Sequence, residues 1–132
     1  MILDTSFLID LMHGEDQARE KLAALEAETV PVKMSSLSAF ELFYGAERYV
    51  EPDEERQKIV AALDEAGAGR VGLSWETGRR AGKIKAELER DGRSIGAVDI
   101  LIAATALEEE TPLLTGNPDH FDRVPGLDVE TY

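Results

Sequence analysis

Apolar residues recur along the chain with two different periods, and turn-forming residues separate the segments. Ala18, Leu22 and Leu25, for example, follow the spacing of one helix face. Short apolar or β-branched runs bounded by polar residues are instead typical of buried strands. We expect strands over 1–4, 29–34, 70–73, 112–114 and 126–129. We expect helices over 7–13, 15–28, 35–49, 53–66, 75–90 and 95–109, and a turn at Asn117-Pro118.

The alternation of strands and helices predicts a single α/β domain over residues 1–132. Units of this kind build a mostly parallel sheet with helices on both faces, which is a three-layer α/β/α sandwich. Ligands in such folds lie beyond the carboxyl ends of the strands. Asp4 and the segment 115–117 directly follow expected strands, so we expect both at this edge of the sheet.

Three acidic residues lie in apolar runs, unlike most of the twenty-seven acids of the chain. They are Asp4, Glu41 and Asp99. An ionised carboxylate among apolar side chains is costly unless it is hydrogen-bonded, paired or bound to a metal. No nearby Lys or Arg is an obvious partner for all three. If they converge, a hard divalent cation that prefers oxygen ligands would relieve their repulsion.

Each of these acids also has a purely structural interpretation. Asp4 is placed to cap the helix that follows it. Glu41 completes an S-x-x-E capping box with Ser38. Asp99 falls in the first turns of its expected helix, where the macrodipole favours a negative charge. Their occurrence on three separate elements favours a shared site.

The segment 115–121 is polar and follows an expected strand. Turn chemistry alone explains its Asn-Pro-Asp sequence, and completion of a metal site is the functional alternative. We expect His13 and His120 to be surface or supporting residues, with a general-base role for His120 as the alternative.

The chain is strongly acidic: it has fourteen Lys and Arg and twenty-seven Asp and Glu, which gives a formal net charge of −13. Nucleic-acid binders usually carry a basic patch, so this balance argues against them. Two explanations reconcile it with nucleic-acid binding. The acids lie on solvent faces in a high-salt cytoplasm, or some of them bind cations that in turn bind phosphate.

Cysteine is absent, which excludes disulfides, thiolate zinc sites and cysteine nucleophiles. No signal-like segment or membrane-length apolar run is visible. We therefore expect a cytoplasmic protein with no membrane contact.

Four motifs together resemble the PIN-domain family and, within it, the VapC toxins. They occupy residues 2–6 (ILDTS), 38–45 (SAFELFYG), 95–104 (IGAVDILIAA) and 114–121 (LTGNPDHF), followed by 124–127 (VPGL). Each is weak alone, but their order and spacing along the whole chain are specific.

The resemblance implies a catalytic Mg²⁺ or Mn²⁺ site made by Asp4, Glu41 and Asp99. Thr5 or Ser6 and Thr115 would supply supporting hydroxyl groups. Many relatives have a fourth acid just after the conserved threonine, where this chain has Asn117. The nearest acid, Asp119, is therefore the candidate for a fourth catalytic residue, with Asn117 as a supporting one. Arg93 precedes the Asp99 helix and is a candidate RNA-phosphate contact by charge and position.

The same resemblance implies an endoribonuclease that forms a homodimer. A small VapB-like antitoxin would hold it inactive by wrapping the domain and inserting a basic residue near the acids. The groove around Phe43, Tyr44 and Tyr49 is the expected antitoxin contact.

Three other functions fit parts of the sequence. A housekeeping PIN nuclease for ribosomal or transfer RNA would have the same site and no antitoxin. A receiver-like module would need an acidic pair after the first strand and a later lysine, which are missing here. A catalytically inactive PIN-fold binding module is suggested by Asn117.

Overall fold

Five parallel strands form the centre of the computed structural model, which describes residues 1–132. The strands are β1 (Ile2–Leu3), β2 (Lys33–Ser35), β3 (Gly69–Val71), β4 (Leu113–Leu114) and β5 (Val129–Glu130). Their order across the sheet is β3-β2-β1-β4-β5, and every neighbouring pair is parallel. The predicted parallel sheet is confirmed.

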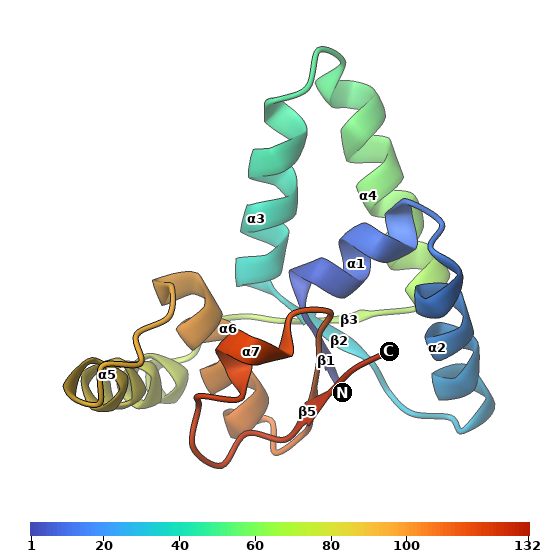
Figure 1. The fold of residues 1–132 in the computed structure, drawn as a ribbon. Helices are drawn as coiled ribbons and strands as arrows, with labels where there is room; N and C mark the ends of the chain where they lie inside the picture. Colours follow the sequence, from blue (N-terminus) through green and yellow to red (C-terminus); the bar gives the residue numbers. More distant parts are fainter.

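Helices cover both faces of the sheet, as Figure 1 shows. One layer contains α1 (Thr5–Met12), α2 (Asp16–Ala27), α3 (Ser36–Glu47) and α4 (Pro52–Ala66). The other contains α5 (Trp75–Arg90), α6 (Ala97–Glu108) and the short α7 (Pro118–Phe121). The three-layer α/β/α sandwich predicted from the sequence is therefore confirmed.

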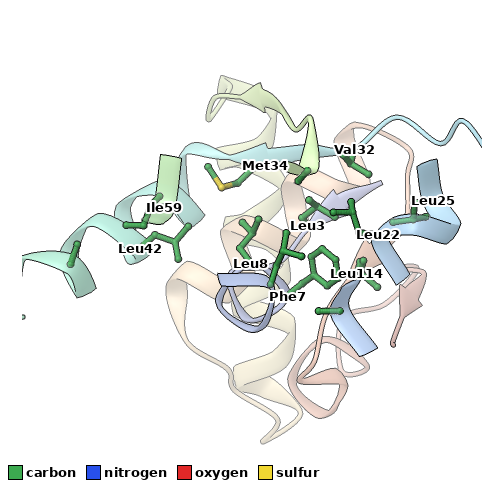
Figure 2. Close-up of a cluster of buried hydrophobic side chains, with 14 residues drawn as sticks. Leu3, Phe7, Leu8, Leu22, Leu25, Val32, Met34, Leu42, Ile59 and Leu114 are labelled. Atoms are coloured by element: carbon green, nitrogen blue, oxygen red, sulfur yellow. The ribbon is translucent and has the colours of Figure 1, made fainter. Parts of the chain in front are cut away.

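Alternation along the central strands creates the two hydrophobic cores. Leu3 and Leu114 face the first layer and pack with Phe7 of α1 and Leu22 of α2, as Figure 2 shows. Ile2 and Leu113 face the opposite layer and belong to the core formed with α5, α6 and α7. Successive side chains of a strand point to opposite faces, so two apolar residues per strand are enough to join three layers.

Three segments differ locally from the sequence predictions. The strand expected over 126–129 is instead β5 at Val129–Glu130, because Gly126 adopts a positive φ of 79° in a turn. The strand expected over 29–34 begins only at Lys33, because Thr29 adopts a positive φ of 56° and the chain turns there. The turn expected at Asn117-Pro118 continues into α7, with Pro118 at its first position, where the fixed φ of proline suits a helix. No helix combines the length and apolar character needed to cross a membrane.

The sheet order places a ligand-binding position beside β1. The chain adds β2 on one side of β1 and β4 on the other, so the connections leave in opposite directions at the carboxyl ends of β1 and β4. Ligands of open α/β sheets bind at such a switch point. Asp4 follows β1 and Thr115 follows β4, and both lie at this point.

Candidate active site

Asp4 is a buried carboxylate held by two hydroxyl groups. The residue is only 5 % exposed. Its Oδ2 accepts hydrogen bonds from Ser6 Oγ at 2.7 Å and Thr115 Oγ1 at 2.8 Å. Asp4 occupies the N-cap position of α1, but its side chain makes no capping hydrogen bond. The capping interpretation is therefore wrong for the side chain, which instead faces the end of β4.

The same hydroxyl groups fix the backbone that follows β4. Gly116 donates its N–H to Ser6 Oγ at 3.0 Å, and Asn117 donates its N–H to Thr115 Oγ1 at 2.9 Å. Ser6 and Thr115, which the sequence predicts as supporting residues, thus connect Asp4 to the segment after β4. Asn117 takes part through its backbone.

Glu41 approaches the site from α3. Its Oε1 accepts a hydrogen bond from Thr5 Oγ1 at 2.7 Å. The capping box with Ser38 is wrong, because α3 begins earlier and Ser35 accepts the capping hydrogen bond from the Ser38 N–H. Burial raises the pKa of Glu41 above its usual range; the hydrogen bond from Thr5 opposes this shift, and the charges of Asp99 and Asp4 add to it. The three predicted acids therefore share one electrostatic environment.

Asp99 lies in the first turn of α6 and pairs with a histidine. Its Oδ2 is 3.1 Å from Nδ1 of His120, which α7 supplies. The Asn117 side-chain amide lies 3.4 Å from the same ring nitrogen. The sequence predicts His120 as a surface or supporting residue, and the structure gives it a direct contact to a site carboxylate.

Two predicted residues have no contact with this cluster. Asp119 is exposed on α7, and its side chain makes no hydrogen bond or ion pair within the chain. Arg93 is also exposed, in the loop between α5 and α6, and its guanidinium has no partner. The roles of Asp119 and Arg93 thus remain predictions, whereas His120 contacts Asp99 directly.

The donor set fits a hydrated divalent cation. No Lys or Arg forms an ion pair with Asp4, Glu41 or Asp99, and their only charged partner is His120 when it is protonated. No three Asp, Glu or His side chains converge closely enough to ligate one ion together. Mg²⁺ usually takes one or two protein carboxylates and keeps several waters, so an ion that retains part of its hydration shell does not require all three side chains to touch it.

Replacing Glu41 by glutamine is expected to stabilise the fold at neutral pH. The raised pKa means that the native state binds protons more tightly than the unfolded chain. The stabilising contribution of protonated Glu41 is thus present at low pH. It is lost as the pH rises above 4.5, the ordinary pKa of a glutamate side chain. Glutamine retains an acceptor for Thr5 without the charge.

Thermal unfolding at about pH 4 and pH 7 measures this effect. The variant should melt a few degrees above the wild type at neutral pH, with little difference at acidic pH. Glu20→Gln, an exposed site on α2, is the matched control and should not change the melting temperature. Destabilisation of Glu41→Gln at pH 7 would contradict the electrostatic assignment.

The predicted antitoxin groove is divided in the structure. Phe43 lines a hollow of about 250 Å³ between α3, α4 and β2. Tyr49 lines a separate hollow of about 130 Å³ between α1, α3 and α4, whose wall includes Glu41. Tyr44 lines neither and lies exposed beside Phe40 and Arg48. The three aromatic residues therefore do not form one groove.

Comparison with known proteins identifies the family. The PIN domain family model matches residues 1–127. Ribonuclease VapC2 of Haemophilus influenzae is 31 % identical over 99 % of this chain and 96 % of its own length. The tRNA(fMet)-specific endonuclease VapC of Salmonella typhimurium is 26 % identical, with 99 % of this chain and 96 % of that protein covered.

Solved structures agree with this assignment. The fold matches VapBC2 from Rickettsia felis, bound to a DNA fragment from its promoter, with a TM-score of 0.91 and 27 % identity. That match covers 99 % of this chain and 97 % of the other. DNA-bound VapBC from Salmonella typhimurium matches with a TM-score of 0.84 and 27 % identity over 98 % and 96 % of the two chains. This chain belongs to the PIN-domain family and, within it, to the VapC ribonucleases.

Proposed function

We propose that this protein is a Mg²⁺- or Mn²⁺-dependent endoribonuclease and the toxin of a VapBC-type toxin–antitoxin pair. The observation that carries the proposal is the grouping of Asp4, Glu41 and Asp99 from three separate elements with no Lys or Arg among them. Such a group repels anions on its own, so an RNA phosphate can enter only together with cations.

The chain's own residues position the reacting groups. Asp4, Glu41 and Asp99 would together hold a hydrated ion, in part through its water molecules. Each carboxylate is kept in place by a different neighbour: Ser6 and Thr115 for Asp4, Thr5 for Glu41 and His120 for Asp99. When bound, the ion would supply an activated water and neutralise charge that develops on the phosphate. Pre-formed hydrogen bonds keep the carboxylates from rotating away during the reaction.

An antitoxin segment fits the hollow that Tyr49 lines. A basic side chain of a VapB-like protein, placed at its Glu41 end, would neutralise the acidic cluster and compete with the metal. The hollow at Phe43 does not include a site acid. We also expect a homodimer, which light scattering of the free toxin tests.

Metal removal is the direct test of the proposed activity. Purified protein should cleave single-stranded or structured RNA with Mg²⁺ or Mn²⁺ and lose this activity in chelator, regaining it when the ion is restored. Isothermal titration with Mn²⁺ measures binding independently of cleavage. Metal-independent cleavage would contradict the proposed site. Absence of cleavage by folded, metal-loaded protein would favour an inactive binding module.

A further inference from the structure

Basic residues are unevenly distributed in this acidic protein. Six of its fourteen Lys and Arg lie between residues 79 and 93, together with only three of its twenty-seven acids. Most of this segment is α5, whose buried face packs on α6. The strongest positive potential of the chain is therefore expected on the solvent-facing surface of α5.

Three of these basic residues border a concave surface. Arg79, Arg80 and Lys83 line a hollow of about 320 Å³ between α5 and the chain near Leu107 and Pro125. Glu87 is the one acid in its wall. The other lining residues are the apolar Ile84, Leu107 and Pro125. Cationic side chains grouped in a hollow suit the phosphate groups of a nucleic-acid backbone.

The three cations are available to a ligand. Lys83 has no ion-pair partner. Arg79 and Arg80 pair with Glu76 and Glu108 at 2.9 Å and 2.6 Å. Exposed pairs of this kind contribute little to stability, so a phosphate can replace the carboxylate at small cost.

One short segment of the chain connects a residue of the hollow to a residue of the active site. Pro125 borders the hollow, and His120, five residues earlier, contacts Asp99. Between them, Arg123 donates a hydrogen bond to the backbone carbonyl of Ser94 at 3.0 Å. Five residues span at most about 17 Å, a distance that a strand of several nucleotides covers.

We propose that the hollow bordered by Arg79, Arg80 and Lys83 binds the sugar-phosphate backbone of the RNA substrate, several nucleotides away from the bond that is cleaved. This inference rests on the proposed function, because it assigns the substrate-holding surface of the same nuclease. It also explains how a chain with a net charge of −13 can bind a polyanion.

Charge reversal with a matched control tests the inference. Arg79→Glu/Lys83→Glu and Arg19→Glu/Lys58→Glu each change the net charge by the same amount, but the second pair lies on α2 and α4. Binding is measured by fluorescence anisotropy in the Asp99→Asn background, with a single-stranded RNA of about 20 nucleotides over a range of KCl concentrations.

Reversal in the hollow should weaken binding by about tenfold or more at 0.1 M KCl, and the control pair by only a few fold. The slope of log affinity against log salt should fall in magnitude by about 1.4, as expected for two lost contacts to a single strand. Glu87→Gln should instead tighten binding, a result that a damaged fold cannot produce. Equal effects of the two reversed pairs would overturn the inference.

Parallel cleavage assays keep this result separate from the proposed function. If the wild type cleaves RNA but Arg79→Glu/Lys83→Glu leaves RNA binding unchanged, the RNA-binding role of the hollow is rejected and the nuclease activity is retained. If the wild type never cleaves RNA but the same variant selectively loses RNA binding, the RNA-binding role of the hollow is retained and the nuclease activity is rejected.

Discussion

Replacing Asp99 by asparagine is expected to lower the rate of RNA cleavage by roughly 10²- to 10³-fold. Asparagine keeps the size of the side chain beside His120 but removes one of the negative charges that would hold the metal. Metal ions stabilise transition-state charge by several kcal/mol, and each 1.36 kcal/mol is about tenfold in rate. The measurement is single-turnover cleavage at saturating Mn²⁺.

Two further readouts separate loss of the site from loss of the fold. Asp16→Asn removes an acid from the first turn of α2 and reproduces the loss of a favourable helix-dipole interaction without touching the site; its cleavage rate should remain at the wild-type value. The Asp99 charge also raises the pKa of Glu41, so this pKa, followed by NMR, should fall in Asp99→Asn. Unchanged cleavage by folded Asp99→Asn would reject its catalytic role.

Patterns within the sequence were sufficient to predict the layers and to single out three acids that lie near one another in the structure. Alternating strands and helices imply the parallel sheet, and its carboxyl edge places Asp4 next to Thr115. The cost of a carboxylate in an apolar run pointed to Asp4, Glu41 and Asp99, and the structure places all three close enough for the charges of Asp4 and Asp99 to raise the pKa of Glu41. These predictions rest on the pattern of apolar residues and on the order of strands and helices, and both can be read from a single sequence.

Contacts between distant segments were not predictable in the same way. Ser38 and Glu41 have capping-box spacing, yet the helix start is set by Ser35 at the end of β2, and Glu41 bonds Thr5 across the interface between α3 and α1. His120 contacts Asp99 only because α7 forms and packs on α6. Asn117 and His120 are three residues apart, the spacing of one helical turn, and this spacing indicates that the two side chains can lie together. The interpretation of Asn-Pro as a simple turn did not use this spacing.

Gly116 is required by a contact that no local pattern reveals. A Cβ atom at this position would lie 2.6 Å from Oη and 3.3 Å from Cζ of Tyr132. The tyrosine is held in place, since its hydroxyl donates to Asp10 Oδ2 at 2.5 Å and its ring packs edge-on against Phe7 at 5.0 Å. The pKa of Tyr132 is raised by its burial and by this hydrogen bond, so the hydroxyl remains neutral at physiological pH.

Replacing Gly116 by alanine is therefore expected to destabilise the protein by about 1–3 kcal/mol, the usual cost of overpacking. Relief by movement of the backbone would break the Gly116–Ser6 hydrogen bond and release the hydroxyl that holds Asp4. Cleavage should thus fall together with stability. Urea unfolding gives the stability and single-turnover cleavage gives the activity.

Tyr132→Phe removes the clashing oxygen and should rescue the alanine variant. Alone it loses the hydrogen bond to Asp10 and is expected to cost about 1 kcal/mol. In the double variant the closest contact of the alanine Cβ is gone, and it meets the ring carbon at 3.3 Å and Asp10 Oδ2 at 3.6 Å. The two effects should therefore be less than additive by about 0.5–2 kcal/mol, with partial recovery of cleavage. Gly78→Ala is the control for an added methyl group, because nothing lies within 4 Å of its Cβ position. Strict additivity of Gly116→Ala and Tyr132→Phe would show that the two residues do not constrain each other.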